Sequence, residues 1–478
     1  MKENQNFYFL LLSVFAAIGI GNMWIFPNSS LKFSGIFFIA YIIGILLIGI
    51  PLLIMEFSVG QYINKDVVGT FSSVAKRFGS VGWLMLINSF LLLSVLAVVL
   101  SWHIIYVIVS FGLKWKTDAR LYFFNRILEV ATGLNSFDIF PLSVFAALIA
   151  AWVIIFFTIR KGHESVRKFV FIAAQVFLVL LIVFLVYPFS LSKSLVGIYS
   201  FLEIDPSQLL NPALWIASFS AAILTLGIGF GVFSAFARKS KDAPVIGYSS
   251  ITAFFQLIVG IMVVLITAGI AGFLSTKKYL PLELLSSEDV SYPFTVLSSA
   301  LPYFYSPTIA SALFFILLSL FVIFGASSLA YLISNILVHR FEIKYRNAAI
   351  IISGFGFLLG LLFVIKPGYY IMDLVMHFFY YNIIFALLLQ CLVIGWSSKS
   401  TEIADGLNSK SSLKIGSFWR LWLKYAVPVF LIALIAVQLR RDFIFGYNRY
   451  PLWSLLGFGL GTFFIPLLTA FSLPKKLM

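Results

Sequence analysis

Long runs of apolar residues follow one another along the whole chain, separated by short segments that hold most of the charged residues. A helix needs about 20 apolar residues to cross the hydrocarbon core of a bilayer, and the runs have about that length or more. The pattern predicts an all-α polytopic membrane protein with about 12 transmembrane helices. The predicted spans are 7–30, 35–62, 82–112, 141–159, 167–189, 213–237, 244–273, 304–337, 347–365, 370–396, 421–439 and 450–472.

The first run is interrupted by residues that weaken a helix. Gly19 and Gly21 have the most backbone freedom to lose, and Pro27 has no N–H and clashes with the preceding turn. A second half-helix that begins just before Pro27 tolerates the proline, because the first turn of a helix has spare N–H groups. In lipid, broken backbone survives only where protein or a water-filled cavity satisfies its polar groups. We therefore predict a break near residues 19–22 and a binding site beside it.

The sixth run repeats this feature, with Gly227, Gly229 and Gly231 inside a span. Because it lies five spans after the first run, the two segments would cross the membrane in opposite directions. Interrupted helices at matching places in two halves indicate a midplane site in a transporter built from inverted repeats. The alternative is that these glycines only allow close packing of helices. The pairing favours a 5+5 inverted repeat with broken helices 1 and 6.

This organisation divides the chain into three parts. The first five-helix repeat would occupy 1–189, the second, inverted repeat 213–396, and helices 11 and 12 would follow in 421–478.

Composition supports the membrane class. Apolar residues make up 61% of the chain, against about 45–50% in soluble domains. The net charge of +15 is best explained by basic loops that face the cytoplasm and anionic lipid, not by nucleic acid. Lysine and arginine are more frequent in the loops on the side of the termini, which predicts a multi-pass protein of the cell membrane with both termini cytoplasmic.

The chain offers little material for catalysis, so we do not expect an enzyme. It has four histidines and no G-x-S-x-G nucleophile motif. Glu56 and Asp373 are the only acidic residues inside the predicted spans, and Asp373 lies at the outer end of its span, where water can reach it. His103, in the third span, is either a histidine satisfied between helices or a proton site.

Two segments near the start carry a resemblance to a known family. The segments 19–27 (GIGNMWIFP) and 49–61 (GIPLLIMEFSVGQ) resemble the first two spans of the neurotransmitter:sodium symporter family, which includes the bacterial leucine transporter. The resemblance implies five-plus-five inverted repeats, alternating access, and uptake of amino acids or related amines driven by Na⁺. In this family, the glutamate that matches Glu56 supports the broken helices through hydrogen bonds. Shorter similarities continue at 101–102, 225–229, 327–330, 373–375 and 395–396.

The resemblance also implies one or two sodium sites. The first would use the carbonyl of Ala17, the amide side chain of Asn22 and a residue of the seventh span, for which the matching position is Thr252. The alternative for Thr252 is a hydroxyl satisfied by its own helix. Such neutral oxygens are ligands that hard cations accept. Whether chloride binds is left open.

The second implied sodium site is incomplete. It would use the carbonyls of Phe15, Ile18 and Ile323 together with the hydroxyl of Ser327. The threonine that usually precedes this serine in the family is Ala326 here, which removes one oxygen.

The substrate site implied by the resemblance lies between the two breaks. The family's span-three tyrosine, which donates to the substrate carboxylate, is replaced by Leu96. A charge-assisted hydrogen bond is worth about 1.5–3 kcal/mol, so its loss favours a bulky, hydrophobic solute that need not carry a carboxylate. The residues expected to line the site are Ile20, Gly21, Leu92, Leu96, Thr225, Gly227, Ile228 and Tyr331.

These expectations favour one function over one alternative. The favoured function is secondary active transport, as Na⁺-coupled symport of an amino acid or related small organic solute by alternating access. The alternative is an uncoupled or proton-coupled relative on the same scaffold, acting in binding, sensing or leak. In both cases the partners are a small organic solute and the lipid bilayer, and the oligomeric state is left open.

Overall fold

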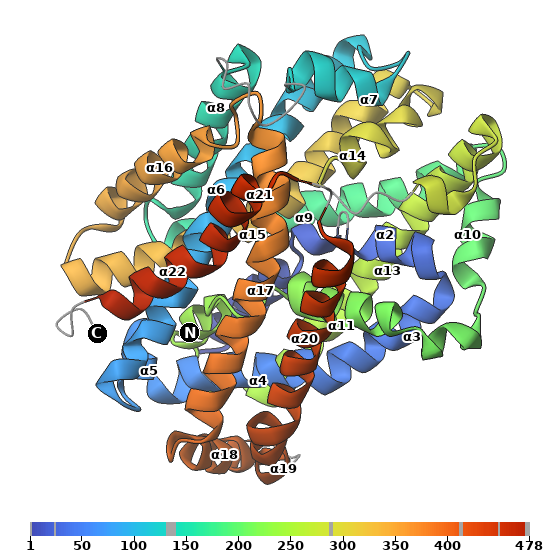
Figure 1. Cartoon of the computed structure of the whole chain (residues 1–478). Helices are drawn as coiled ribbons and strands as arrows, with labels where there is room; N and C mark the ends of the chain where they lie inside the picture. The colour runs from blue at the N-terminus through green and yellow to red at the C-terminus, as the bar shows by residue number, and fades with distance from the viewer. Residues whose placement is uncertain are drawn as a thin grey trace.

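The computed structural model describes residues 2–22, 25–130, 140–285, 290–410, 414–447 and 450–473, and the regular elements in these residues are all helices (Figure 1). Within them, nine helices are long and apolar enough to cross a membrane, and three shorter apolar helices occupy the remaining predicted spans. This confirms the all-α polytopic membrane fold. The nine are Gly35–Ile63, Lys76–Gly112, Leu142–Ile159, His163–Ser190, Val245–Lys278, Pro307–Phe341, Gly368–Gly395, Gly416–Ile444 and Leu452–Ser472, and the shorter ones are Gln5–Ala17, Pro212–Leu226 and Tyr345–Leu361.

The principal helices fall into an N-terminal set, a second set and a C-terminal pair of spans. The first set is α1 (Lys2–Ala17), α2 (Ile25–Phe33), α3 (Gly35–Gly44), α4 (Ile50–Ser58), α6 (Gly79–Val109), α8 (Leu142–Ile159) and α9 (His163–Val186). The second is α11 (Pro212–Leu226), α12 (Val232–Ala237), α13 (Val245–Lys278), α15 (Pro307–Phe341), α16 (Tyr345–Leu361) and α17 (Gly368–Gly395). The C-terminal spans contain α19 (Gly416–Leu421), the π-helical turn η12 (Trp422–Ala426), α20 (Val427–Phe445) and α22 (Gly461–Ser472).

Both predicted breaks are present. The first span consists of α1, the short helix η1 (Ile20–Asn22) and α2, so a new half-helix does begin just before Pro27. The sixth span consists of α11 and α12, separated by residues 227–231. Met23 and Trp24 of the first motif lie outside the described residues.

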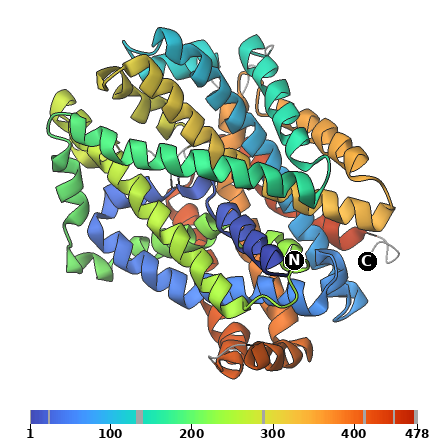
Figure 2. The same ribbon diagram turned by 180° about the vertical axis from the view of Figure 1, so that it is seen from behind.

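The broken helices lie in the interior of the helix bundle. α1 packs between α9 and α13, as seen from behind in Figure 2. α6 packs along α15, while α11 packs on α3. Three residues at the two breaks, Ala17, Leu226 and Ile228, are completely buried. The neighbouring helices therefore satisfy the condition that broken backbone be covered by protein.

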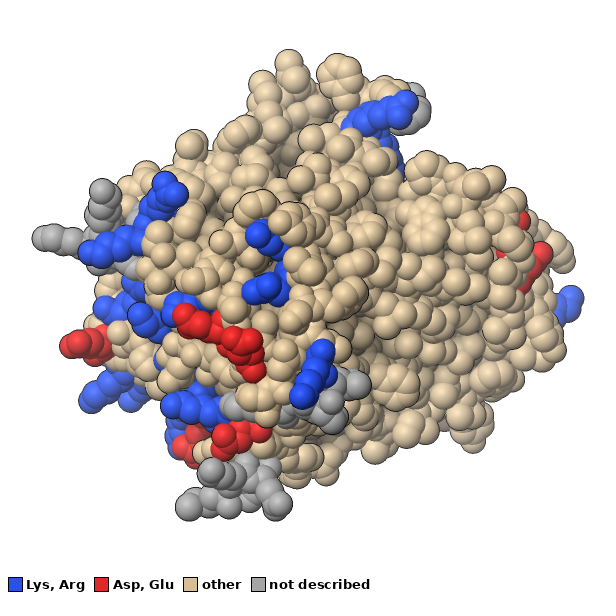
Figure 3. Space-filling model, turned by 90° about the horizontal axis from the view of Figure 1, so that it is seen from below, with Lys and Arg blue, Asp and Glu red and all other residues tan. Residues whose placement is uncertain are grey.

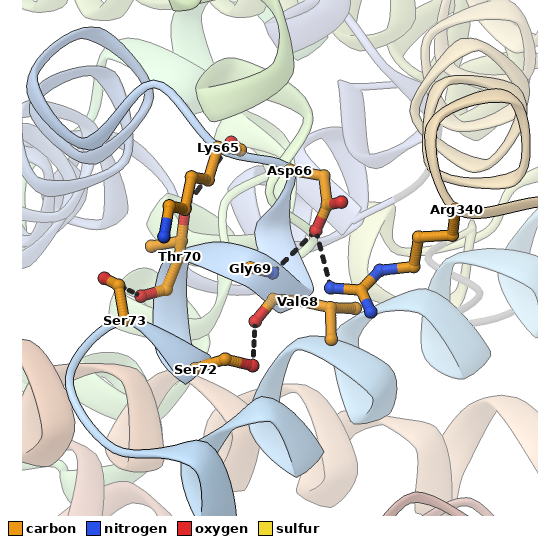
Figure 4. A network of polar contacts seen from close by, with 8 residues as sticks. All are labelled: Lys65, Asp66, Val68, Gly69, Thr70, Ser72, Ser73 and Arg340. Carbon is orange, nitrogen blue, oxygen red and sulfur yellow. Dashed lines mark hydrogen bonds and ion pairs between the residues drawn. The ribbon is translucent and has the colours of Figure 1, made fainter. Parts of the chain in front are cut away.

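Charged side chains are unevenly distributed over the surface. Seen from below, Lys, Arg, Asp and Glu gather toward one side, and a wide uncharged surface extends beside them (Figure 3). Between the second and third spans, Asp66 caps α5 (Val67–Ser72) by accepting a hydrogen bond from Gly69 N at 2.6 Å. Its carboxylate also pairs with Arg340, at the end of α15, with an N–O distance of 3.2 Å (Figure 4).

The acidic residues of the last helices differ from the prediction. α20 extends beyond residue 439 and includes Asp442, so Glu56 and Asp373 are not the only acidic residues within spanning helices. Asp442 Oδ2 lies 2.6 Å from His377 Nε2, and it accepts a hydrogen bond from Tyr381. Asp373 is partly buried, and its carboxylate accepts hydrogen bonds from the hydroxyls of Tyr447 and Tyr450.

Candidate functional site

The first break leaves two carbonyl groups without their helical donors. The N–H of Gly19 donates to the Ala17 carbonyl at 2.8 Å, and the N–H of Asn22 donates to the Gly19 carbonyl at 3.2 Å. In an unbroken helix, these two N–H groups would pair with the carbonyls four residues earlier. Those carbonyls belong to Phe15 and Ile18, two of the predicted oxygen ligands.

The second break depends on three glycines. Gly227, Gly229 and Gly231 have φ angles of 66°, 100° and 86°. Residues with a Cβ rarely adopt such values, whereas glycine does so at little cost. The chain can therefore leave α11 and enter α12 only because glycines occupy these positions.

The two breaks touch each other through their backbones. A Cβ atom added to Gly21 would lie 3.1 Å from both Cα and Cγ2 of Thr225. One added to Gly227 would lie 3.5 Å from the carbonyl oxygen of Ala16. The structure thus brings together Gly21, Thr225 and Gly227, which were predicted to line one site.

A buried network of polar side chains surrounds this crossing. The amides of Asn22 and Gln256 bond reciprocally: Asn22 Nδ2 donates to Gln256 Oε1 at 2.8 Å, and Gln256 Nε2 donates to Asn22 Oδ1 at 2.6 Å. Gln256 Nε2 also lies 3.4 Å from the hydroxyl of Tyr41. The Tyr41 and Thr225 hydroxyls are 2.8 Å apart, and Thr225 Oγ1 donates to the Ala221 carbonyl. The network links the first, second, sixth and seventh spans.

Sequence reasoning missed Gln256 and Tyr41 and selected Thr252 on the seventh span. Thr252 lies one turn before Gln256, is completely buried, and its Oγ1 has no hydrogen-bond partner among the residues the structure describes. The alternative reading, in which its own helix satisfies this hydroxyl, is therefore wrong. The available signal for Gln256 was an amide side chain in the middle of an apolar span, where polar groups are costly.

Glu56 stabilises the second break through hydrogen bonds. Its Oε1 accepts a hydrogen bond from Gly229 N at 2.7 Å, and its backbone carbonyl accepts one from Ser234 Oγ at 2.7 Å. On the other side of the break, Gln390 Nε2 donates to the carbonyl of Gly229 at 3.1 Å. The predicted supporting role of Glu56 is confirmed, and Gln390 shares it.

The two helices that carry most residues of the second implied ion site, α1 and α15, pack against each other. The Phe15 ring is 4.7 Å from the Phe324 ring on α15, so the end of α1 meets the segment that holds Ile323 and Ser327. Ser327 is completely buried, and its Oγ donates to the Phe324 carbonyl at 3.2 Å, a long hydrogen bond.

The remaining predicted lining residues are distributed more widely. Leu96 is buried against α15, with Cδ1 3.5 Å from the position of a Cβ on Gly325. Ile228 is buried within the second break, and Leu92 is partly buried on α6, one turn before Leu96. Ile20 contributes its backbone to η1, while its side chain lies outside the described part of the chain.

Tyr331 occupies a different environment from the other predicted lining residues. Its ring stacks on Phe236 of α12 at 5.4 Å and lies 5.9 Å from the ring of His163 at the start of α9. The structure therefore does not bring Tyr331 into the polar network at Asn22, and we leave it out of the proposed site.

His103 makes its polar contact within its own helix. Its Nδ1 lies 2.8 Å from the carbonyl oxygen of Val99, and its ring packs 4.7 Å from the ring of Phe294. A carbonyl only accepts, so Nδ1 carries the hydrogen when the ring is neutral. Of the two alternatives for His103, a polar contact between helices is not found in the described residues, where its polar contact lies one turn back along α6, and a proton site stays untested.

Comparison with known proteins identifies the family. The family model described as "Sodium:neurotransmitter symporter family" matches residues 2–119 and 113–476. An uncharacterised sodium-dependent transporter of Methanocaldococcus jannaschii is 26% identical over 97% of this chain and 95% of its own length. The sodium-dependent nutrient amino acid transporter 1 of Drosophila grimshawi is 25% identical over 93% of this chain and 81% of its own length. A sodium- and chloride-dependent GABA transporter of Drosophila melanogaster is 27% identical over 53% of this chain and 31% of its own length.

These matches agree with the helical membrane fold. The family and its relatives are sodium-dependent transporters, so the chain is a multi-pass membrane transporter and not an enzyme. Use of Na⁺ and transport of a small solute follow from the family. The chain belongs to the sodium:neurotransmitter symporter family.

Proposed function

We propose that the protein is a secondary active transporter that couples inward movement of Na⁺ to uptake of an amino acid or a related small organic solute by alternating access. Relatives named as sodium-dependent amino acid transporters match nearly the whole chain, which supports this substrate class. The observation that carries the proposal is the crossing of the two breaks beside buried oxygen atoms. We further propose that 1–189 and 213–396 form the two repeats and that both termini face the cytoplasm of a plasma-membrane protein.

The buried oxygens at the first break fit a sodium ion. Thr252 Oγ1 is a buried oxygen without a hydrogen-bond partner among the described residues, and it lies one turn from the amide that bonds Asn22. The proposed first site consists of this hydroxyl, the carbonyl of Ala17, the amide oxygen of Asn22 and the Thr225 hydroxyl. Gln256 would orient the Asn22 amide, because one reciprocal pair fixes both side chains.

The proposed second site uses the carbonyls freed by the first break. Phe15 and Ile18 have lost their helical donors, and the carbonyl of Ile323 and the Ser327 hydroxyl lie on the adjoining α15. Four neutral oxygens suit a hard monovalent cation better than a soft metal. When bound, sodium would supply positive charge at this point, and the oxygens of Phe15, Ile18, Ile323 and Ser327 would hold it between the first break and α15.

The proposed solute site lies at the crossing itself. The backbone of Ile20 and Gly21 would meet a polar group of the solute, because N–H groups at the start of a half-helix favour negative charge. Leu92, Leu96 and Ile228 would surround an apolar side chain, with Thr225 and Gly227 on the opposite wall. An amino acid or amine with a bulky apolar side chain fits these surroundings best.

A comparison of thermal stability in Na⁺ and K⁺ tests the ion sites. A ligand at 100 times its Kd stabilises a folded protein by about 2.7 kcal/mol, so the purified protein should melt at a higher temperature in Na⁺. The shift should shrink in Asn22→Leu and Thr252→Val. It should persist in Thr158→Val, which removes a buried hydroxyl from α8 that is already bonded to the Ile155 carbonyl. Equal melting in both cations, or an undiminished shift in Asn22→Leu, would contradict the proposed site.

A further inference from the structure

Pro51 leaves a gap in the hydrogen bonding of the second span. This proline lies at the second position of α4, directly after the π-helical turn η2 (Ile45–Gly49), inside a continuous helical segment that crosses the bilayer. In an α-helix, the N–H of residue 51 would donate to the carbonyl of Leu47, and proline has no N–H. In a membrane, neighbouring helices must supply the missing donor.

Two tryptophans from the eleventh span donate to the backbone at this gap. Trp422 Nε1 donates to the carbonyl of Leu47 at 2.8 Å. Trp419 Nε1 donates to the carbonyl of Pro51 at 3.0 Å. The tryptophans are three residues apart and the two carbonyls four residues apart, so each pair lies on one face of its helix. Trp422 therefore provides the donor that Pro51 lacks.

The contact of Trp419 is more deeply buried than that of a third tryptophan, Trp396. Trp419 is 2% exposed, whereas Trp396 is 59% exposed and donates to the Lys424 carbonyl at 3.2 Å. An indole N–H is only a donor, and when buried it usually finds an acceptor. Trp396 thus offers the same chemistry at a site where no proline is involved.

The same stretch of helix carries the residue that holds the second break. Glu56 lies five residues after Pro51 on α4 and accepts the hydrogen bond from Gly229 N. The helix α4 therefore joins the carbonyls that Trp419 and Trp422 bond to the carboxylate that bonds Gly229, between α11 and α12. A shift of α4 at Pro51 would move Glu56 relative to Gly229.

We propose that Trp419 and Trp422 are positioning residues: Trp422 replaces the hydrogen bond lost at Pro51, Trp419 bonds the carbonyl of Pro51 itself, and together they fix α4, which places Glu56 against the second break. The pairing of Trp422 with Pro51 stands on the hydrogen bonds alone. Its effect on ion affinity rests on the proposed sodium sites.

A double-mutant cycle tests the pairing in K⁺, where no Na⁺ effect enters. Trp422→Phe keeps an aromatic ring and removes the donor, so it should lower thermal stability in the wild-type background. Pro51→Ala restores a backbone N–H at residue 51, so Trp422→Phe should cost much less in that background. Trp396→Phe should cost the same in both. An equal cost of Trp422→Phe in the two backgrounds would overturn the proposed pairing.

Sodium affinity then tests the positioning role. One neutral hydrogen bond changes an equilibrium constant by about two- to tenfold, so Trp422→Phe should raise the Na⁺ concentration for half-maximal stabilisation by that factor. Trp422→His keeps a ring N–H and should recover part of the Na⁺ affinity that Trp422→Phe loses. If Pro51→Ala does not fold, this comparison of the two Trp422 variants serves as the test. Normal Na⁺ affinity in Trp422→Phe, or equal loss in both variants, would refute the positioning role. If the wild-type protein is not stabilised by Na⁺ at all, the result would instead contradict the proposed function.

Discussion

The crossing of the two breaks makes Gly21 sensitive to one added methyl group. In Gly21→Ala, the new Cβ would lie 3.1 Å from Thr225 Cα and Cγ2 and 3.3 Å from Thr225 N. Two of these three atoms are backbone, and the second break is fixed by Glu56 and Gln390, so the contact cannot relax by a side-chain rotation alone. Overpacking of this kind costs about 1–3 kcal/mol.

Gly19→Ala is the matched control within the same break. A Cβ at Gly19 would lie 3.9 Å from the backbone carbonyl oxygen of Ala16, which is an ordinary contact. Replacing glycine by alanine where the backbone permits it stabilises a protein by about 0.4–1 kcal/mol. The two variants should therefore change the free energy of unfolding in opposite directions, although each adds one methyl group and the two positions are only two residues apart.

Binding assays and thermal stability measure the difference. A cost of 1–3 kcal/mol that falls on the state with both breaks in contact corresponds to about five- to 150-fold in Na⁺ affinity. Gly21→Ala should show this loss with a lower melting temperature, and Gly19→Ala should bind Na⁺ as the wild type does. Thr225→Ser removes Cγ2 but neither backbone contact, so it should rescue Gly21→Ala only in part. Equal behaviour of Gly19→Ala and Gly21→Ala would refute the close approach of the breaks.

Two further predictions concern single hydrogen bonds. Glu56→Gln keeps an acceptor for Gly229 N, whereas Glu56→Leu leaves that buried N–H unpaired at a cost of about 1–3 kcal/mol. The melting temperature should therefore fall far more in the leucine variant. Equal losses in the two variants would show that the charge of Glu56 matters instead of the hydrogen bond. Asp66→Ser and Asp66→Ala both lose the ion pair with Arg340, but the serine keeps an N-cap acceptor for Gly69 N. Asp66→Ser should therefore be more stable than Asp66→Ala by about 1 kcal/mol. Equal denaturation midpoints for the two variants would contradict the capping role shown in Figure 4.

The breaks were predictable because they depend on local residue types. Glycine and proline disfavour a helix wherever they occur, so residues 19–27 and 227–231 carry the information about where the first and sixth spans fail. The role of Glu56 also followed from its place in a highly specific motif. Local interruptions of helical structure can therefore be predicted from short stretches of sequence.

Contacts between distant helices were not predictable in the same way. The bond between Asn22 and Gln256 joins residues 234 positions apart, and it depends on the relative register of the first and seventh spans. Thr252, one turn earlier, has the same apolar surroundings in the sequence. Asp442 was missed for a related reason: hydropathy ends a span where charge begins, whereas α20 continues because His377 and Tyr381 satisfy the carboxylate.

Uptake by the protein in sealed vesicles tests the central claim most directly. The protein is reconstituted with K⁺ inside and Na⁺ outside, and labelled amino acids with apolar side chains are added. The proposed sites predict that one of them accumulates above its external concentration, that accumulation requires the inward Na⁺ gradient, and that Asn22→Leu abolishes it. Equilibration without accumulation, or accumulation driven by a proton gradient in the absence of Na⁺, would contradict Na⁺-coupled symport.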